Sequence, residues 1–521
     1  MLRFLFKDIP LPADIKGVIK MAERKHLFGT SDKSDFIVNM TDAGAKKLCA
    51  MYCIIAMAII ELIAIPYYFT KNVVDYYDTF GELQMPHYLS DKVIYWAAVV
   101  MFGLGILGFS IFIIGRMKKQ ISLKDNKALL WMAGIIVMSL ISALASSEIN
   151  NAMTGYQDRA EGFLTLIGYY GFFAAAFTVV AEDWKKRVCA AIITIGAVNA
   201  VIGILQVIPA LEDIVPNWFT MLNVTFTQGI KVPAANGLAM TPHALAAILT
   251  VSFAAALTAV CFARSLPARL LSGAAAVLMV AAGVFTRTVT AYIGLGCSAL
   301  FVLIIAVCYA AKDSSSEPEE AEEDTEPSVP RKSVLAGLLC GLAAAACAVA
   351  VLAVTDNVEL HDEEVIRTDS IRMLMLLDRE DSDTWIYPYL WDDGLYVTEQ
   401  NPLLGTGPDN WATIYSHGLT IDRTYNEYID TAMQRGVITA GLYLIFLLIT
   451  LYKAVKAVAG FVKGRLGWGT AAASAAAAAY MVQAFFNISA LTSTPFFFIC
   501  AGLVWSTTAK KKSRVKKQGG K

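Results

Sequence analysis

The chain has 521 residues, of which 56% are hydrophobic and 17% are charged, and its mean hydropathy is +0.54. These values exclude an ordinary soluble globular protein and are typical of a polytopic membrane protein. The formal net charge is −1, and the basic residues follow the alternation of the loops described below, so nothing in the composition indicates a nucleic acid partner.

Long apolar runs occur throughout the chain. A helix that crosses a bilayer needs about 20 mostly apolar residues. Runs of this kind lie at residues 48–69, 93–115, 128–146, 162–181, 188–210, 242–263, 270–286, 289–311, 333–355, 436–457, 468–487 and 493–508. The sequence therefore predicts an all-α polytopic membrane protein with about 12 transmembrane helices and a large outward-facing loop domain.

The Lys/Arg bias of the short connections predicts the orientation of these helices, because cytoplasmic connections carry the excess of positive charge. The basic residues fall on alternate turns, at Arg116, Lys118 and Lys119, at Lys185, Lys186 and Arg187, at Arg264 and Arg269, and at Lys453, Lys456, Lys463 and Arg465. The N-terminal segment 1–47 and the tail 509–521 are also basic, so we expect both in the cytoplasm. No small-residue cleavage site follows the first run, and we expect it to stay as an anchor.

Glu61 is a carboxylate placed deep in the first apolar run. Burial there is costly unless the side chain finds a hydrogen-bond partner or water. Gln206, Gln483 and Asn487 of other runs are candidate partners for a structural contact. The alternative is that Glu61 lines a groove for a lipid tail or an acceptor.

Arg287 stands in a tight connection between the runs at 270–286 and 289–311, on the side that we predict to face outward. The positive-inside bias discourages a positive charge at such a position. The side chain therefore either points into a polar cavity, which we favour, or snorkels to the outer headgroups.

Two polar segments divide the second half of the chain. Residues 312–332 are acidic, contain Pro and Ser and have almost no apolar side chains, so we predict a disordered cytoplasmic linker between the first eight helices, at 48–311, and the ninth at 333–355. Residues 356–435 form the longest outward loop, before the last three helices at 436–508, and we expect the active site there. All nine cysteines lie in or beside apolar runs, so the sequence predicts neither a disulfide nor a zinc site.

The outward loop contains five arginines and no lysine: Arg367, Arg372, Arg379, Arg423 and Arg435. Arginine keeps its charge at any accessible pH, and its planar fork matches the oxygens of a phosphate. A phosphate-bearing ligand would favour this choice, although each arginine could instead pair with a neighbouring carboxylate. The many aromatic residues of the same loop suit either stacking on sugar rings or an interfacial belt.

Residues 401–411 of this loop read NPLLGTGPDNW. Gly405 and Gly407 permit backbone conformations closed to other residues and expose amide N–H groups. Together with Asn410 they either cradle a phosphate or form a structured turn before the next helix. A Gly-x-Gly pattern alone does not separate these interpretations.

On these residues the chain resembles the O-antigen ligase and polymerase superfamily, membrane glycosyltransferases that use polyprenyl-diphosphate-linked glycans. NPLLGTGPDNW is similar to the family's Pro-Leu-Leu-Gly-x-Gly stretch, and DRTYNEYIDTAMQRGVITAGLYL, from residue 422, is similar to its His-Asn-x-x-Leu helix. Weaker similarities lie at Thr286-Arg287, at Ser370-Ile371-Arg372 and at TPHALA in residues 241–246.

The resemblance implies a GT-C-like membrane fold and transfer of a glycan from a polyprenyl-diphosphate carrier, such as undecaprenyl diphosphate, to an acceptor hydroxyl. It places the reaction on the outer face of a bacterial cytoplasmic membrane, in cell-surface polysaccharide biosynthesis, and implies no metal or other cofactor. The expected partners are the lipid-linked donor, a glycan, lipid or wall acceptor, and membrane lipids. Ligase, polymerase and protein glycosylase activities stay open.

One departure from the family concerns the catalytic base. The resemblance puts the family histidine at Tyr425, beside the matching Asn426, and a tyrosine with a pKa near 10 is a poor base at neutral pH. We therefore expect the catalytic residues among Tyr425, Glu427 and His417. The substrate-binding candidates are Arg287, Arg372, Gly405, Gly407, Asn410, Arg423 and Asn426. Among these, Arg287 and Arg372 would stabilise negative charge on the departing diphosphate.

Two other classes of protein fit a chain of many membrane helices. A flippase for lipid-linked glycans, or another transporter, usually places ionisable groups or broken helices near the membrane midplane. The polar residues here are concentrated in the outward loop instead. A sensory or scaffolding protein would need a cytoplasmic output module, and the cytoplasmic segments contain only the acidic linker and basic tails.

Overall fold

The structure is a computed structural model, and it describes most of the membrane helices and part of the outward loop. The described residues are 41–73, 87–117, 129–156, 159–208, 222–225, 231–311, six helical residues between 334 and 343, 357–359, 365–367, 387–410, 414–416, 419–421 and 423–507. The chain divides into two compact units, Met1–Ala45 and Lys46–Lys521. The description below concerns the second unit. The predicted linker at 312–332 and the tail at 509–521 lie outside the described residues.

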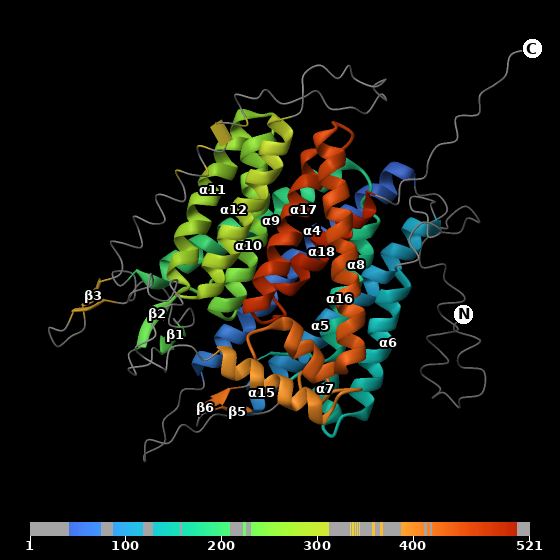
Figure 1. The fold of residues 1–521 in the computed structure, drawn as a ribbon, viewed down its shortest axis with the longest axis vertical. Helices are drawn as coiled ribbons and strands as arrows, with labels where there is room; N and C mark the ends of the chain where they lie inside the picture. The colour runs from blue at the N-terminus through green and yellow to red at the C-terminus, as the bar shows by residue number, and fades with distance from the viewer. Residues whose placement is uncertain are drawn as a thin grey trace, which may run out of the picture. The chain divides into compact units, whose positions relative to one another are not determined.

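Most of the described residues are helical (Figure 1). The helices are α4 (Asp42–Val73), α5 (His87–Met117), α6 (Leu129–Ala145), α7 (Ile149–Thr154), α8 (Phe163–Phe177), α9 (Glu182–Val207), α10 (Pro242–Phe262), α11 (Leu266–Phe285), α12 (Val289–Ala310), α15 (Tyr387–Gln400), α16 (Glu427–Val462), α17 (Trp468–Gln483), the 3-10 turn η3 (Ala484–Phe486) and α18 (Thr494–Ser506). Most of them overlap the predicted apolar runs. The helices α4, α5 and α16 extend beyond their runs at both ends, and α7 and α15 correspond to no predicted run.

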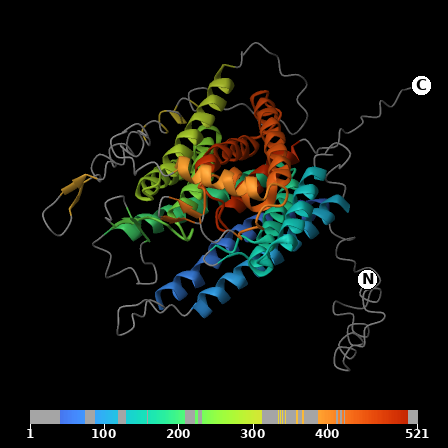
Figure 2. The same ribbon diagram turned by 60° about the horizontal axis from the view of Figure 1, so that its bottom comes forward.

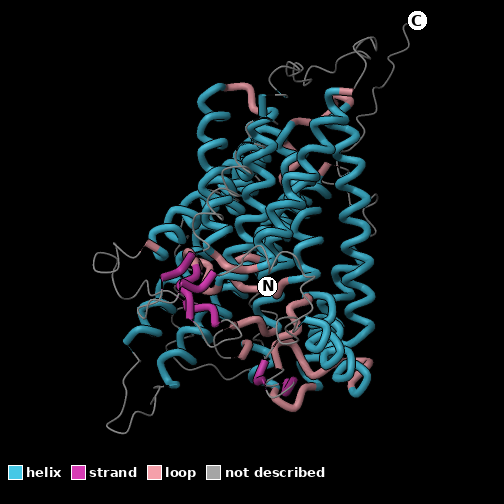
Figure 3. The backbone as a smooth tube through the Cα atoms, turned by 60° about the vertical axis from the view of Figure 1, so that its left-hand side comes forward, coloured by secondary structure: helices cyan, strands magenta, loops and turns pink. Residues whose placement is uncertain are grey.

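Three short antiparallel strand pairs accompany the helices, and the sequence did not predict them. They are β1 (Leu222–Thr225) with β2 (Lys231–Ala234), β3 (Asn357–Glu359) with β4 (Val365–Arg367), and β5 (Ile414–Ser416) with β6 (Leu419–Ile421). In the last pair Ile414 lies opposite Ile421. Figure 3 shows strands in magenta beside the lower ends of the helices. All three pairs lie in connections that we predict to face outward.

Six helices in the described part of the chain are long and apolar enough to cross a membrane. They are Tyr95–Met117 within α5, and α9, α10, α11, α12 and α16. The helices α6, α8 and α18 are apolar but shorter. The chain is therefore a polytopic membrane protein, as predicted, while the full number of crossings stays a prediction.

Helix α10 is the central helix of the bundle. Its apolar window is entirely buried, and it packs against α9, α11, α12 and α17. Small residues make this possible: α10 contains the stretch SFAAALTA, and α17 contains AAASAAAAA. Small side chains let membrane helices approach closely. In contrast, α11 and α12 leave leucines such as Leu270 and Leu300 exposed, as a lipid-facing surface requires.

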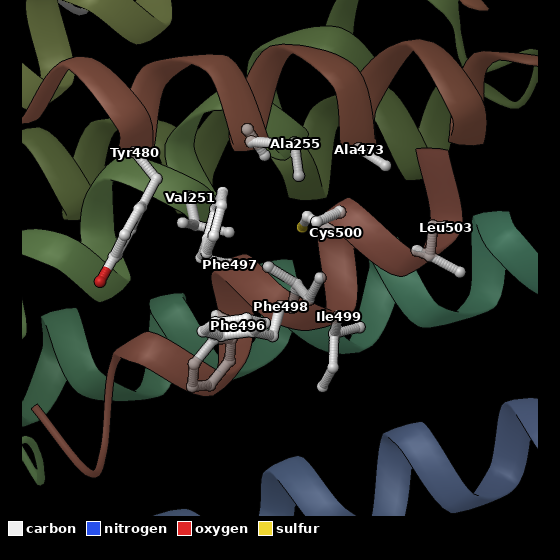
Figure 4. Packing of buried hydrophobic residues seen from close by; sticks show 14 of the residues in the cluster. Val251, Ala255, Ala473, Tyr480, Phe496, Phe497, Phe498, Ile499, Cys500 and Leu503 are labelled. Carbon is white, nitrogen blue, oxygen red and sulfur yellow. The ribbon is translucent and has the colours of Figure 1, made fainter. Parts of the chain in front are cut away.

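Aromatic side chains of α18 pack against α17 and α16 in a buried apolar cluster (Figure 4). Phe497 stacks on Tyr480 of α17 with ring centroids 4.8 Å apart. The ring centroids of Phe498 and Phe446, which lies in α16, are 6.0 Å apart. Such ring contacts add to the area that the side chains bury. They hold the end of α17 in a fixed position, and Figure 4 shows the Tyr480 hydroxyl pointing away from this apolar cluster.

The connections between helices gather at two separate ends. At one end, Lys185 of α9 donates to Thr470 of α17 at 3.1 Å, and both lie in connections that we predict to be cytoplasmic. At the other end, the Asn487 amide donates to the carbonyl of His243 at 3.1 Å, which joins two connections that we predict to face outward. The alternation of the basic loops agrees with this grouping, and which end faces outward stays a prediction.

Helix α16 is interrupted at Gly436, whose φ of 80° and ψ of 162° are not helical. The loop before α16 closes this break, because the N–H of Gly407 donates to the carbonyl of Gln434 at 2.8 Å and the N–H of Val437 donates to the carbonyl of Pro402 at 2.8 Å. Buried backbone groups need such partners, especially in a membrane. The stretch NPLLGTG is thereby bound to the start of α16. Helix α15 packs against α16 at the same end of the helix bundle (Figure 2).

Gly436→Ala should lower stability, because a Cβ at this position would collide with the carbonyl of Leu403 while the backbone keeps a positive φ. We expect a loss of more than about 1 kcal/mol, measured by thermal unfolding in detergent. Gly441→Ala is the matched control in the same helix, since nothing lies within 4 Å of its Cβ position. Equal melting temperatures for the two variants would contradict this role of Gly436.

Candidate active site

The turn before α16 is held in a strained conformation. Tyr425 has a φ of +52°, which is uncommon for a residue with a side chain. On one side, the Thr424 N–H and hydroxyl both donate to Asp430, at 3.0 and 2.9 Å. On the other, Asn426 caps α16 by accepting from two N–H groups of its first turn, at 3.0 and 3.2 Å. These contacts fix Tyr425 from both neighbours.

Arg423 lies in a buried ion-pair network directly before this turn. Its side chain donates to Glu161 at 2.7 Å and to Asp409 at 3.2 Å. Asp409 also pairs with Arg159 at 2.9 Å. Two cations thus face two carboxylates, which is the arrangement that buried charges require. The network joins the connection between α7 and α8 to the NPLLGTGPDN loop and to the Tyr425 turn.

The pKa values of this network follow from burial and charge. Burial raises the pKa of the Asp409 carboxyl, although Arg159 and Arg423 act in the opposite direction. For Arg423, burial alone would lower the pKa of the guanidinium, but the carboxylates of Glu161, Asp409 and Asp430 together raise it. Arg423 therefore stays charged at any accessible pH.

Glu161 receives two further hydrogen bonds, which complete its surroundings. The Tyr169 hydroxyl donates to one oxygen at 2.6 Å, and the Ser489 hydroxyl donates to the other at 3.0 Å. With Arg423 bound to the same carboxylate, the guanidinium has partners inside the protein. This geometry favours a positioning role for Arg423 over direct contact with a phosphate.

Glu427, the first residue of α16, is buried and accepts hydrogen bonds from two phenols. The Tyr443 hydroxyl donates at 2.6 Å and the Tyr480 hydroxyl at 3.0 Å. The Tyr480 hydroxyl also forms a hydrogen bond with the Thr494 hydroxyl of α18, at 3.1 Å. One carboxylate oxygen is thus bound within α16, by Tyr443, and the other binds the start of α16 to α17, through Tyr480. A general base must reach the proton of the acceptor hydroxyl, and at Glu427 the two phenols compete for the same oxygens.

Tyr425 packs against a histidine that the sequence analysis did not name. The ring centroids of His243 and Tyr425 are 4.9 Å apart, with an angle of 53° between the planes. His243 is the second residue of α10, and both side chains are partly buried. The contact brings the motif TPHALA of residues 241–246 next to the position of the family histidine.

Arg287 occupies the turn between α11 and α12 with a φ of +54°. Its flanking residues Thr286 and Thr288 bind each other through their hydroxyls at 2.9 Å. Only 7% of Arg287 is exposed, so protein encloses the side chain, and this favours the polar cavity over snorkelling. The N–H of Ala235 donates to the carbonyl of Phe285 at 2.8 Å, which puts the turn beside the irregular segment 234–241.

Two amide side chains of α9 hold that segment. Gln206 accepts from the N–H of Gly237 at 2.9 Å, and Asn199 accepts from the N–H of Leu238 at 2.8 Å. The amide nitrogen of Asn199 donates to Glu61 at 2.7 Å. Asn199 is therefore the partner of Glu61, in place of the three that the sequence suggested, because α4 and α9 meet at this depth. This favours the structural interpretation of Glu61.

The amides of the NPLLGTGPDN loop donate within the protein. Gly405 donates to the carbonyl of Asn401 at 3.0 Å and Gly407 to that of Gln434 at 2.8 Å. Asn410 donates from its side chain to Ser146 at 2.7 Å. A phosphate would have to displace these bonds, so the geometry favours a structured turn over a phosphate cradle.

Two of the expected site residues, Arg372 and His417, lie outside the described residues. Among the residues that the structure describes, no group of three or more His, Cys, Asp or Glu side chains is arranged to hold a metal ion.

The sequence analysis missed two residues that the structure brings to the site. Glu161 is an acidic residue just before an apolar run, in a short connection that we predict to face outward, and this position was a usable signal for a site residue. His243 follows a proline at the start of a helix, but no local pattern showed that it would meet Tyr425, which lies far away in the chain.

Residues 274–444 match a family model described as O-Antigen ligase. This supports the O-antigen ligase/polymerase superfamily, so the resemblance inferred from the motifs is confirmed. The matched part contains the Arg287 turn, the NPLLGTGPDN loop and the Tyr425 turn. No curated protein matches the chain. The family implies a glycosyltransferase-like enzyme that acts on a lipid-linked glycan and an acceptor.

Asp409→Ala should destabilise the protein, because it leaves Arg159 and part of Arg423 without their buried carboxylate. Removal of one partner of a buried pair costs roughly 3–5 kcal/mol, which thermal unfolding in detergent would measure. Asp183→Ala is the control, since the Asp183 side chain is 84% exposed and its pair with Lys186 is long, at 3.5 Å. A melting temperature no lower than that of the control would exclude a stabilising network at Asp409.

Proposed function

We propose, from this place in the O-antigen ligase/polymerase superfamily, that the protein transfers a glycan from a polyprenyl-diphosphate carrier to an acceptor hydroxyl. The reaction takes place on the outer face of the bacterial cytoplasmic membrane, in cell-surface polysaccharide biosynthesis. One observation carries the proposal. Contacts link the Arg287 turn through the segment 234–241 and His243 to the Tyr425 turn, so these described positions lie at the same end of the helix bundle.

The chemistry of the transfer makes clear what this end of the bundle must supply. The acceptor oxygen forms a bond to C1 of the donor sugar, and the bond from C1 to the diphosphate breaks with its electron pair. The lipid diphosphate leaves, and the proton of the acceptor hydroxyl passes to a base. Negative charge therefore grows on phosphate oxygens, and a fixed cation shielded from bulk water stabilises it without reorganisation.

Arg287 is the described arginine that suits this task best. It is enclosed by protein, and its backbone is held in a left-handed turn flanked by bound threonines. The guanidinium fork offers two parallel donors to phosphate oxygens. Arg372 would contribute the second cation from the outward loop. Arg423 is bound to Glu161 and Asp409, which suits a role in holding the Tyr425 turn in place.

Transport of a lipid-linked glycan is the alternative that the assay must separate. The described ion-pair network of Arg423 joins connections at one end of the helices instead of lining a path between them. Glu61, which lies deep in α4, is bound to the amide that anchors the segment 234–241. Both observations support a scaffold for a site at the membrane surface.

The purified protein, incubated with a polyprenyl-diphosphate oligosaccharide and an acceptor, should form new glycosidic bonds that mass spectrometry resolves. A ladder of products indicates a polymerase, and a single transfer indicates a ligase or protein glycosylase. Donor that stays unchanged at every acceptor tested would refute the proposed reaction and leave transport as the better explanation.

Arg287→Ala and Arg372→Ala should each reduce the rate of transfer about 100-fold or more, because each removes a donor from the developing phosphate charge. Lysine at either position should rescue poorly, since it lacks the planar fork. Arg187→Ala is the control: Arg187 is exposed and stacks on Trp184 at the opposite end of the bundle. Full activity of both alanine variants, at normal expression, would overturn the role of these arginines.

A further inference from the structure

We propose that His243 is the proton acceptor of this reaction, and that it replaces from α10 the histidine that the family carries at the position of Tyr425. The inference rests on the proposed function. It goes beyond it by assigning the proton acceptor to a residue of the weaker similarity TPHALA, outside the part that matches the family model.

The contact between the two rings is the first step. The centroids of His243 and Tyr425 are 4.9 Å apart, so the imidazole lies within one side-chain length of the family position. A base attached to α10 can therefore serve the same acceptor hydroxyl as a base attached to residue 425. The tyrosine fills the space beside the imidazole and limits the orientations open to it.

The backbone segments that carry the two rings are held from separate elements. Tyr425 is fixed by the bonds of Thr424 to Asp430 and by the Asn426 cap. On the other side, the backbone of His243 is fixed because its carbonyl accepts from Asn487 at 3.1 Å. A proton acceptor works best when its position is fixed before the substrate binds. The site meets this condition from α10, from the start of α16 and from the connection after η3.

The imidazole is also available, unlike the other described candidates. In the part of the chain that the structure describes, no hydrogen bond joins a ring nitrogen of His243 to a protein group, and the side chain is only partly buried. The two oxygens of Glu427 accept from Tyr443 and Tyr480. The phenol of Tyr425 is a poor base at neutral pH. His243 is thus the described group beside the Tyr425 turn with an unoccupied basic nitrogen.

A histidine has an ordinary pKa of about 6.5, so the neutral imidazole is the main form at neutral pH. The uncharged ring accepts the proton as the acceptor oxygen attacks C1 and the lipid diphosphate leaves with the electron pair. The negative diphosphate formed in the same step balances the new positive charge on the imidazolium.

The test compares full-length variants in the donor and acceptor assay described above. His243→Gln, which keeps a polar side chain without a basic nitrogen, should lower kcat about 100-fold or more and leave the KM for the donor within about threefold. Tyr425→Phe should lose less than about tenfold, since it keeps the ring contact. In the double variant His243→Ala with Tyr425→His, the histidine returns to the family position, and transfer should rise above that of His243→Ala alone.

The outcomes separate this inference from the proposed function. A wild-type protein that transfers nothing overturns both. If the wild type is active and His243→Gln keeps its kcat, or loses only donor affinity, the role of His243 alone is overturned. A double variant that folds normally, as judged by its melting temperature, but is no more active than His243→Ala also counts against the role of His243. A proton acceptor can act from either position, whereas a histidine with only a structural role could not be replaced by one at residue 425.

Discussion

The pairing of a buried guanidinium is the constraint on which the site depends. Arg423 is only 3% exposed, and an unpaired charge at such a place would be strongly unfavourable. It therefore requires Glu161, from the connection between α7 and α8, and Asp409, from its own connection between α15 and α16. Because both carboxylates must reach the same cation, two connections far apart in the sequence are forced together. The Tyr425 turn begins at the next residues and takes its position from this network.

Irregular backbone buried in the helix bundle imposes a second requirement, since each polar group there needs a partner within the protein. The segment 234–241 meets it through Asn199 and Gln206 of α9. The break at Gly436 meets it through the NPLLGTGPDN loop. These polar side chains and glycines therefore act as the scaffold of the site. They also explain how an apolar bundle tolerates non-helical chain beside its central helix α10.

The family positions thus divide into two groups by their surroundings. Gly405, Gly407 and Arg423 make contacts inside the protein that fix loops. Arg287 and Tyr425 stand in left-handed turns, a conformation that costs energy and persists where the surrounding structure enforces it. Tyr425 meets His243 from α10, which gives a physical account of how a chain without the family histidine at this position keeps a proton acceptor beside it.

The sequence by itself determined the membrane helices, their alternating basic connections and the resemblance to the family, because apolar length, charge and motif spacing are local properties of the chain. It also indicated Arg287, because a positive charge is disfavoured in a tight connection between two apolar runs on the side that we predict to face outward. Only the tertiary structure decided which polar groups meet: Arg423 with Glu161, 262 positions apart, Glu61 with Asn199, and Tyr425 with His243. The reason is that a buried polar side chain takes its role from its partner, and helix packing selects that partner from distant parts of the chain.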